Sequence, residues 1–313
     1  MQLDIVVTFF ILGALAQLIR SDIQFPRSLY QTLTLFLLIA IGLKGGVALR
    51  EHADLSLAPQ ALAVIMLGLL LPLIAFPLLK RVGQLSRDDA SSIAAHYGSV
   101  SVGTYAVAVA VLESRGIEYE AYFPVFVVLL EMPAIAVGLA LARRSDEAMD
   151  RGKLVHEIFC NQGVVLLSGA MFIGYWAGDG VASIMPLFGD LFHGALALFL
   201  LEMGLVAASR LPDIRHVAPF MSAFGVLMPM VGAALGGLLA HGLGFSSGGV
   251  ALLAVLGASA SYIAVPAVMR NALPQANHGL SIAASLGITF PFNVLVGIPL
   301  YITGAAWLTA SAG

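Results

Sequence analysis

Charged side chains are scarce in this chain. Asp, Glu, Lys and Arg make up 11% of its 313 residues, while 59% of the residues are hydrophobic; soluble domains carry roughly 25% charged residues. A soluble fold is therefore excluded, and we expect an all-α polytopic membrane protein surrounded by lipid. The formal net charge of −3 comes without any basic cluster, so the sequence offers no surface for nucleic acid.

Cysteine pairs and clusters of metal ligands are also missing. The single cysteine, Cys160, excludes an internal disulfide. The scattered histidines show neither the spacing of a metal site nor a nucleophile beside a base. We therefore predict no enzyme, no catalytic residue and no cofactor. A purely structural scaffold is the remaining alternative, but it would leave the interrupted segments described below unexplained.

Ten segments are predicted to cross the membrane, since a span needs about 20 mostly apolar residues. They run over Ile5–Ile19, Ser28–Val47, Gln60–Leu79, Ser91–Leu112, Ala121–Ala142, Leu154–Ala177, Leu187–Ala208, Ala218–His241, Gly248–Met269 and Leu280–Leu308. Residues 1–143 thus hold five spans, residues 144–153 form a polar linker, and residues 154–313 hold five more.

The basic residues predict the orientation of these spans, because Lys and Arg concentrate in cytoplasmic loops. Twelve of them fall in the loops after odd-numbered spans, and three fall on the other side. The twelve are Arg20, Arg27, Lys80, Arg81, Arg87, Arg143, Arg144, Arg151, Lys153, Arg210, Arg215 and Arg270; the three are Lys44, Arg50 and Arg115. We expect both termini outside and the Arg143–Lys153 linker inside.

An odd number of spans per half makes the second half enter the membrane upside down, so related halves would form an inverted repeat. Three short motifs recur in order and support that relation. Leu38–Leu43 matches Leu200–Leu205, the serines at 99 and 101 match those at 259 and 261, and Leu130–Pro133 matches Ile288–Pro291. The offsets are 162, 160 and 158 residues, which is nearly constant.

The fourth and ninth spans are interrupted by small and polar residues at the same depth. We predict that each helix breaks there, near residues 97–103 and 257–262, because two interrupted spans in corresponding positions point to a transporter substrate site. The crossing would bring two helix N-termini together, which favours a small anion. The predicted anion site comprises Gly98, Ser99, Ser101, Gly103, Thr104, Ala258, Ser259, Ser261 and Tyr262. Tight helix packing is the plainer reading of such small residues.

The carbonyl ends of the broken helices suit a sodium ion. Glu131 lies within an apolar span, and carboxylates at that depth are costly and usually functional. The predicted sodium ligands are Glu131, Thr289, Asn293, Ser101 and Ser261. The alternatives are a structural pair between Glu131 and Lys44, or a protonated, hydrogen-bonded Glu131 side chain. For Glu202 and His193 we leave functional and structural roles open, and we expect His96 to pack or hydrogen bond.

Three stretches resemble the sodium-dependent bicarbonate permeases first known from cyanobacteria. They are His96–Ser101 (HYGSVS), Gly257–Pro266 (GASASYIAVP) and Gly287–Asn293 (GITFPFN). The resemblance covers nearly the whole chain. It implies a five-plus-five inverted repeat similar to the bile-acid sodium symporters, with a core domain of spans 3–5 and 8–10, including the crossed spans 4 and 9. Spans 1, 2, 6 and 7 would form a gate domain.

Function and partners follow from the same resemblance. Its members are trimers that import bicarbonate with sodium, so we expect a homotrimer in a bacterial inner membrane and an elevator-like movement of the core. Some members are shut by a small PII-type nucleotide-sensing protein, whereas the Arg143–Lys153 linker is shorter than the cytoplasmic insert of cyanobacterial members. A sodium symporter for another small organic anion, or a sodium/proton antiporter of similar fold, are the alternatives within the class.

Overall fold

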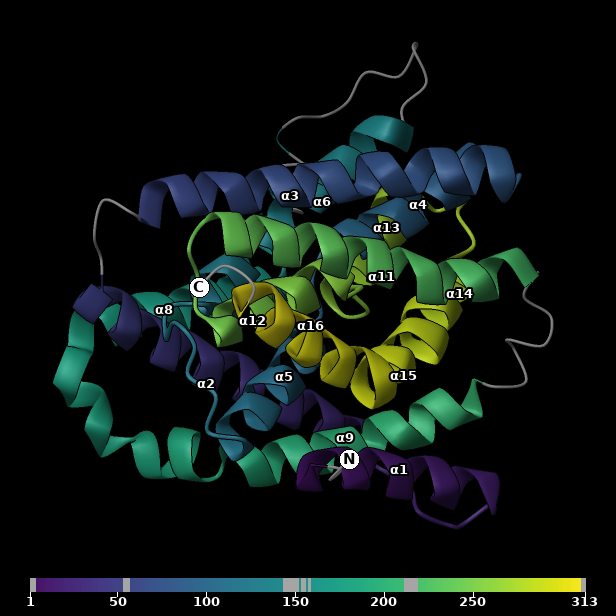
Figure 1. Cartoon of the computed structure of the whole chain (residues 1–313). Coiled ribbons are helices and arrows are strands. Elements are labelled where there is room, and N and C mark those ends of the chain that lie inside the picture. Colours follow the sequence, from purple (N-terminus) through teal and green to yellow (C-terminus); the bar gives the residue numbers. More distant parts are fainter. Residues whose placement is uncertain are drawn as a thin grey trace.

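A computed structural model shows a chain built from helices, with no strand among the residues it describes (Figure 1). Those residues are 4–52, 57–142, 152, 156, 159–210 and 219–310. Most of the Arg143–Lys153 linker, which carries four of the twelve predicted cytoplasmic charges, lies outside them, as does Arg215.

The helices follow the predicted segments in order. The first half contains α1 (Ile5–Leu18), α2 (Arg27–His52), α3 (Leu57–Pro77) with the π-helical turn η1 (Leu78–Val82), α4 (Arg87–Gly98), α5 (Val102–Ser114) and α6 (Pro124–Ala142). The second contains α8 (Gln162–Ala177), η2 (Gly178–Ser183), η3 (Pro186–Asp190), α9 (Phe192–Ser209), α11 (Pro219–Gly242), α12 (Ser247–Ala258) and α13 (Ala264–Ala272). The last segment runs through α14 (His278–Ile282), η4 (Ala283–Thr289), α15 (Phe290–Phe292), η5 (Asn293–Gly297) and α16 (Ile298–Ala310).

Eight helical segments within the described residues are long and apolar enough to cross a membrane. The two other predicted spans are shorter in the structure: α1 has 14 residues, and the ninth segment is divided into α12 and α13. The protein is thus an all-helical protein with several candidate membrane spans, and the count of ten stays a prediction.

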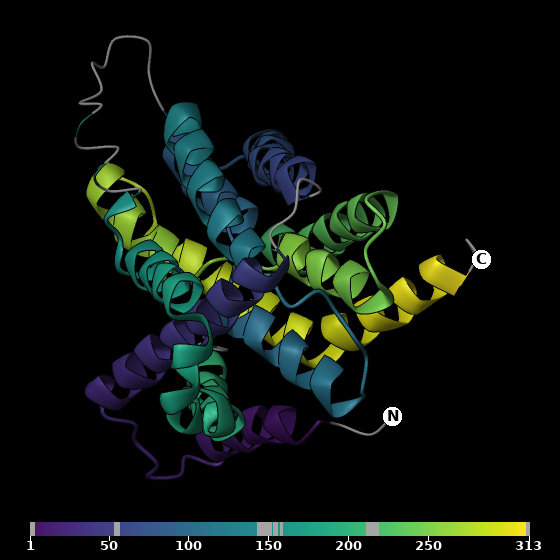
Figure 2. The ribbon, with the colours of Figure 1, turned by 90° about the vertical axis from the view of Figure 1, so that its left-hand side faces the viewer.

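Two helix pairs form one group within the fold. Helix α1 packs along α9, and α2 packs along α8. Glycines permit both contacts. In the α1–α9 pair, an added Cβ at Gly13 or Gly204 would collide with the backbone of the partner helix. In the α2–α8 pair, the same holds for Gly46 and Gly174. In both views the α1–α9 pair lies on the opposite side of the molecule from α3 and α6 (Figures 1 and 2).

The remaining helices form a second group around the two interrupted segments. Helix α4 packs on α3 and α6, while α12 packs on α11 and α16. The loop after α5 holds the start of α12, since the Glu120 carboxylate accepts the Ser246 amide at 2.7 Å. The loop after α13 is held at the start of α4 in the same manner, by the Asn277 amide donating to Asp89 at 2.6 Å. The start of each interrupted segment is therefore held by a hydrogen bond to the loop that follows the other interrupted segment.

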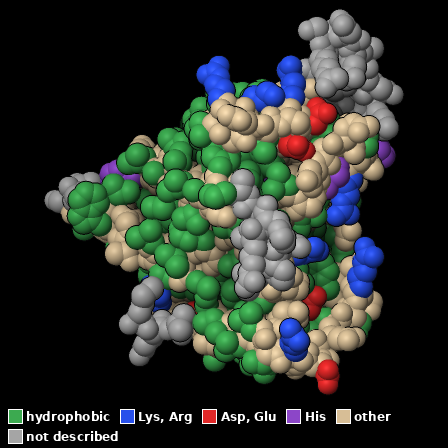
Figure 3. Space-filling view, turned by 90° about the vertical axis from the view of Figure 1, so that its right-hand side faces the viewer, with side chains coloured by type: hydrophobic (Ala, Val, Ile, Leu, Met, Phe, Trp, Pro, Cys, Tyr) green, Lys and Arg blue, Asp and Glu red, His purple; other side chains and the backbone are tan. Residues whose placement is uncertain are grey.

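The outer surface is largely apolar. Figure 3 shows hydrophobic side chains across the middle of one face, with Lys and Arg towards its edges. Large apolar residues on the outer sides of α1, α3 and α8 are exposed, including Leu12, Met66 and Phe172. Trp176 and Trp307 are 74% and 71% exposed near helix ends, as is typical of residues at a membrane interface. Such a surface suits lipid and not water.

Gly232 allows the close approach of α11 to α12. A Cβ at this position would collide with the carbonyl oxygen of Gly257, whereas a Cβ at Gly237, on the same helix, would make an ordinary 3.5 Å contact with Ala254. We expect Gly232→Ala to destabilise the protein by about 1–3 kcal/mol through overpacking. Gly237→Ala should be neutral or stabilising by about 0.5–1 kcal/mol, because alanine favours a helix over glycine. Thermal unfolding in detergent compares them, and equal midpoints would contradict the tight α11–α12 contact.

Candidate functional site

The first predicted break is present between α4 and α5. Helix α4 ends at Gly98, and Ser99 and Ser101 on either side of Val100 have extended backbone angles. Ser101 is the N-cap of α5, because its hydroxyl accepts the amide of Thr104 at 3.1 Å. The sequence placed the start of α5 near Gly103, and it begins one residue earlier, at Val102.

The second break is present between α12 and α13. Helix α12 ends at Ala258, Ser259 is extended, and α13 starts at Ala264. The Ser261 hydroxyl accepts the amide of Val265 at 3.3 Å, in the first turn of α13. In both second half-helices, therefore, a first-turn amide donates to a serine hydroxyl three or four residues earlier in the chain, as the matching Ser-x-Ser motifs suggest. Their other first-turn amides have no acceptor within the helix.

The two breaks are hydrogen-bonded to each other. The Ser101 amide donates to the Ser259 hydroxyl at 3.0 Å. The Ser261 amide donates to the carbonyl of His96 at 2.9 Å, and Nδ1 of His96 lies 2.6 Å from the Ser261 carbonyl. The serines at 99, 101, 259 and 261 are all buried. The interrupted segments thus meet inside the protein, where irregular backbone is tolerated because protein surrounds it.

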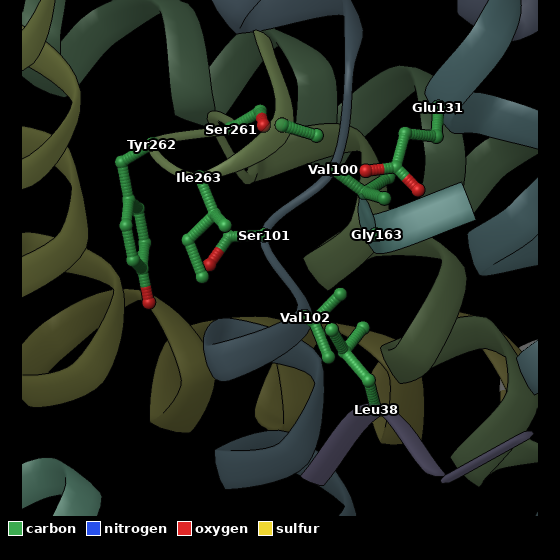
Figure 4. A pocket seen from close by; sticks show the side chains of 10 residues that line it. Leu38, Val100, Ser101, Val102, Glu131, Gly163, Ser261, Tyr262 and Ile263 are labelled. Carbon is green, nitrogen blue, oxygen red and sulfur yellow. The ribbon is translucent and has the colours of Figure 1, made fainter. Parts of the chain in front are cut away.

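A small cavity adjoins this meeting point (Figure 4). It is lined by Leu38, Val100, Ser101, Val102, Glu131, Gly163, Ser261, Tyr262, Ile263 and Ala264. Both breaks contribute to it, and so do α2 and α8 from the other helix group. The cavity has a volume of about 10 Å³, which is roughly enough for one water molecule. A particle of that size fits the cavity as it stands, whereas a larger ion requires its walls to move.

Glu131 of α6 brings a carboxylate to this cavity (Figure 4). The residue is 2% exposed, and its Oε2 has no hydrogen-bond partner within the described part of the chain. The other oxygen, Oε1, lies next to Gly163, where an added Cβ would come within 3.1 Å of it. Lys44, the alternative partner, instead lies 4.7 Å above the centre of the Phe192 ring. Carboxylate and serine oxygens together suit a hard cation such as sodium.

Thr289 and Asn293, the two other predicted cation ligands, do not line this cavity. Thr289 donates to the Gly225 carbonyl at 2.7 Å and also contacts the Tyr97 hydroxyl at 2.7 Å. Asn293 donates to the carbonyl of Ala258, the last residue of α12, at 2.9 Å and accepts from Tyr301 at 3.0 Å. Both sit in the π-helical stretches η4 and η5, which are frequent at functional sites. Asn293 holds the carbonyl end of the second break.

The predicted anion residues are brought together around the crossing, although only Ser101, Ser261 and Tyr262 line the cavity. The Ser99 hydroxyl is buried and has no partner within the described residues. Gly103 lies against Tyr262, because an added Cβ would collide with the tyrosine hydroxyl. Gly98 packs on Pro72 in the same close manner, and Thr104 and Ala258 are buried.

Sequence reasoning missed the cavity residues contributed by the other helix group. Leu38 begins one of the repeated motifs, but it is apolar, and Gly163 is a single small residue, so neither was predicted to belong to the site. Asn161, the N-cap of α8, accepts the Val164 amide at 3.0 Å, whereas the sequence placed this residue inside the predicted span Leu154–Ala177. Its side-chain oxygen and the Glu131 carboxylate both lie next to Gly163, which follows only from the packing of α8 on α6.

Two further residues left open by the sequence have separate positions. Nε2 of His193 on α9 lies 3.3 Å from the carboxylate of Glu113 on α5, and Tyr119 donates to the same carboxylate at 2.9 Å. Glu202 lies on α9 and does not line the cavity. Neither residue lines the cavity at the crossing.

The comparison with known families agrees with this geometry. A family model described as the Na+-dependent bicarbonate transporter superfamily matches residues 5–306, which confirms the resemblance found in the three motifs. No curated protein matches the chain. The matched family is one of transporters and not of enzymes.

Proposed function

This chain belongs to the Na+-dependent bicarbonate transporter superfamily, and from that premise we propose that it is a secondary transporter that imports bicarbonate together with sodium. The observation that carries the proposal is the cavity at the crossing, where a buried carboxylate faces the two hydrogen-bonded breaks. No other buried carboxylate in the described residues lacks a hydrogen-bond partner in this way.

The anion in this proposal binds at the crossing. The first turns of α5 and α13 present backbone amides there, and helix N-termini attract anions without an arginine. The hydroxyls of Ser99, Ser101 and Ser261 and of Tyr262 supply further donors, with Thr104 in the first turn of α5, and Ser259 becomes a donor when its hydroxyl leaves the Leu256 carbonyl. Gly98, Gly103 and Ala258 leave room beside them. Bicarbonate is small enough for such a site once the walls separate.

The cation in this proposal binds next to the anion. Glu131, Ser101 and Ser261 are its ligands, since their oxygens share the cavity. Thr289 and Asn293 act on this site indirectly. Thr289 is hydrogen-bonded to Tyr97 near the end of α4, and Asn293 is hydrogen-bonded to Ala258 at the end of α12, so both hold the ends of the broken helices in place. Sodium binding would balance the uncompensated charge of Glu131 and of the bound anion, which explains why uptake of one ion would require the other.

Alternating access in this proposal is a displacement of one helix group past the other. The group around the breaks, α3–α6 and α11–α16, would be the moving core, and α1, α2, α8 and α9 would be the gate. Two facts support this division. First, residues of both groups line the cavity. Second, α1 and α2 begin the first half of the chain as α8 and α9 begin the second, so interchanging the halves turns the packed pair α1–α9 into the packed pair α8–α2. That exchange is what an inverted repeat of residues 1–143 and 154–313 predicts.

The setting of the transporter is part of the same proposal. We place it in a bacterial inner membrane as a homotrimer, with both termini outside. A PII-type regulator is not part of the proposal, because the Arg143–Lys153 linker is shorter than the cytoplasmic insert of cyanobacterial members. A symporter for another small organic anion is the nearest alternative, because serines and amides at a crossing recognise carboxylates as well.

Uptake of labelled bicarbonate into proteoliposomes tests the function and its stoichiometry together. We expect uptake to need an inward sodium gradient and to increase under an inside-negative potassium diffusion potential. One carboxylate and two sets of carbonyl ends favour more than one sodium per bicarbonate, and each additional sodium then gains about 2.3 kcal/mol per 100 mV. Potassium in place of sodium is the control.

The outcomes of this experiment separate two claims. Bicarbonate uptake that proceeds equally without sodium would contradict sodium-coupled transport itself. Uptake that needs sodium but ignores the potential would contradict only the electrogenic stoichiometry and favour one sodium per bicarbonate. Sodium-driven uptake of a small carboxylate that outcompetes bicarbonate would instead identify the alternative substrate.

A further inference from the structure

Three helix beginnings face the small cavity, and the crossing explains only two of them. Val102 starts α5 and Ala264 starts α13, and both belong to the breaks. The third is α8, which reaches the cavity through Gly163, its second residue. Helix α8 lies in the other helix group, packed along α2. The cavity therefore contains a contact between the two groups that the crossing of the broken helices does not account for.

Gly163 lies against the carboxylate of Glu131 (Figure 4). An added Cβ at Gly163 would come within 3.1 Å of Oε1 of Glu131, which is closer than an ordinary van der Waals contact, and within 3.7 Å of Cβ of Ala264. The Glu131 side chain is 2% exposed, and its Oε2 has no partner within the described residues. A buried carboxylate with an unpartnered oxygen thus faces the start of α8 at close range.

The start of α8 keeps two backbone amides without an acceptor inside the helix. Asn161, the N-cap residue, accepts the amide of Val164 with its side chain and the amide of Val165 with its carbonyl, both at 3.0 Å. The amides of Gln162 and Gly163 come before these two, so the helix offers them no acceptor. Such amides give a helix start a positive charge of about half an elementary charge. This positive end of α8 lies beside Glu131.

The positive end of α8 and a sodium ion compete for the same negative charge. A helix start stabilises a carboxylate but repels a cation next to it. The serine oxygens of the breaks attract sodium, whereas the start of α8 opposes it. Glu131 belongs to the proposed core and α8 to the proposed gate, so the distance between them changes when one group moves past the other. Glu131 therefore has two alternative counter-charges, and the arrangement of the helix groups decides between them.

We propose that the first turn of α8 is a counter-charge for Glu131 that displaces sodium from this carboxylate when the helix groups are arranged as described here. The sodium ion leaves to water, the backbone N–H groups take over its electrostatic role, and no covalent bond changes. The Arg143–Lys153 linker, which is predicted to lie inside, precedes α8, so the release is towards the cytoplasm. The inference rests on the proposed function, because it concerns how the cation of that cycle is released. Gln162 and Gly163 are positioning residues, since they act on sodium through Glu131.

Gln162→Pro removes one of the two amides and should preserve the helix. Proline is favoured at the first position of a helix, where its missing N–H has no helical acceptor. It also needs an extended residue before it, and Asn161 has φ −70° and ψ 149°. Gln162 is exposed, so its side chain can be replaced without disturbing the interior.

Gly163→Ala is the second variant, and it keeps both amides. Because its Cβ would lie 3.1 Å from Oε1 of Glu131, the carboxylate must move away from α8 by a few tenths of an ångström. Gly169→Ala is the matched control, since it lies on the same helix and its Cβ would meet nothing within 4 Å. Thermal unfolding in detergent shows that the variants compared are folded.

Calorimetric titration with sodium measures the expected effect without transport. It would be done without bicarbonate, at pH 9 so that protons compete little for Glu131, and with choline keeping the ionic strength constant, because salt screens charges. A helix end that faces a partly buried charge changes a binding constant by up to about thirtyfold. We expect Gln162→Pro and Gly163→Ala to bind sodium about threefold to tenfold more tightly than wild type and Gly169→Ala. A substitution that only damaged the site would weaken sodium binding, so the sign of the change separates the two explanations.

Two modes of transport then test the release step. Net uptake of bicarbonate into sodium-free proteoliposomes requires sodium to leave on the inside. Exchange of labelled bicarbonate with saturating sodium on both sides does not require it. We expect both α8 variants to slow net uptake by about the same factor as they tighten sodium binding, about threefold to tenfold, and to leave exchange as in Gly169→Ala.

Each outcome decides a different claim. Unchanged or weaker sodium binding in the folded α8 variants would overturn the counter-charge. Tighter binding with net uptake and exchange slowed equally would overturn the release step. If the variants show the expected order of sodium affinity but wild type takes up no bicarbonate with sodium, the counter-charge stands and the proposed function fails.

Discussion

Replacing Glu131 by glutamine should raise the sodium concentration needed for half-maximal bicarbonate uptake at least a hundredfold. Glutamine keeps the size of the side chain and one carbonyl oxygen, but it removes the charge that faces Ser101 and Ser261 in the cavity. A unit charge about 4 Å from a cation, at an effective dielectric constant of about 20, contributes about 4 kcal/mol. That energy corresponds to about a thousandfold in affinity, and partial compensation by the amide oxygen lowers the expected effect.

Glu202→Gln is the matched control for that result. It removes a carboxylate from another membrane helix, α9, that does not line the cavity. Sodium activation would be measured at saturating bicarbonate in both variants, so that a change in anion affinity is kept apart from a change in cation affinity. Equal sodium activation in Glu131→Gln and wild type would remove Glu131 from the cation site.

Ser99→Ala and Ser259→Ala should each weaken bicarbonate binding about tenfold to a hundredfold. A hydrogen bond to a charged group contributes about 1.5–3 kcal/mol, and each factor of ten in affinity corresponds to about 1.4 kcal/mol. Half-saturating bicarbonate at saturating sodium is the measurement. Ser209→Ala is the control, because its hydroxyl bonds the Val206 carbonyl at the end of α9.

The same two variants should differ in stability, which tests the hydrogen bonds between the breaks. The Ser99 hydroxyl has no partner among the described residues, so its removal should leave thermal unfolding unchanged. The Ser259 hydroxyl accepts the Ser101 amide and donates to the Leu256 carbonyl. Its removal leaves that buried amide unpaired, which costs about 1–3 kcal/mol.

For the affinity measurement, normal bicarbonate affinity in both variants would exclude the crossing as the anion site.

Much of the organisation was predictable because lipid imposes simple rules on sequence. A low fraction of charged residues and repeated apolar segments indicate membrane helices, since backbone groups in lipid must bond within a helix. The positions of both breaks were predictable for a related reason. Glycines and serines in mid-span are poor helix formers, and their recurrence at nearly the same offset marked residues 99–101 and 259–261 as a pair.

The predicted cation ligands show where sequence reasoning stopped. Glu131 stood out because a carboxylate in an apolar span is costly, and the structure brings it to a cavity with Ser101 and Ser261. Thr289 and Asn293 were chosen from the repeat, which relates positions along the chain but not the directions of side chains. In the π-helical stretches η4 and η5 these side chains bond Gly225 and Ala258 instead of lining that cavity.

By itself, then, the amino-acid sequence determined the class of protein, the order of its helices, the places where two of them break and the family to which it belongs. Only the tertiary structure decided which side chains share a cavity. Leu38 of α2 and Gly163 of α8 reach it through contacts between helices far apart in the chain, and the approach of α11 to α12 depends on Gly232 facing Gly257. Such contacts depend on the relative rotation and separation of packed helices, which are properties of the assembled side-chain surfaces and not of any local pattern.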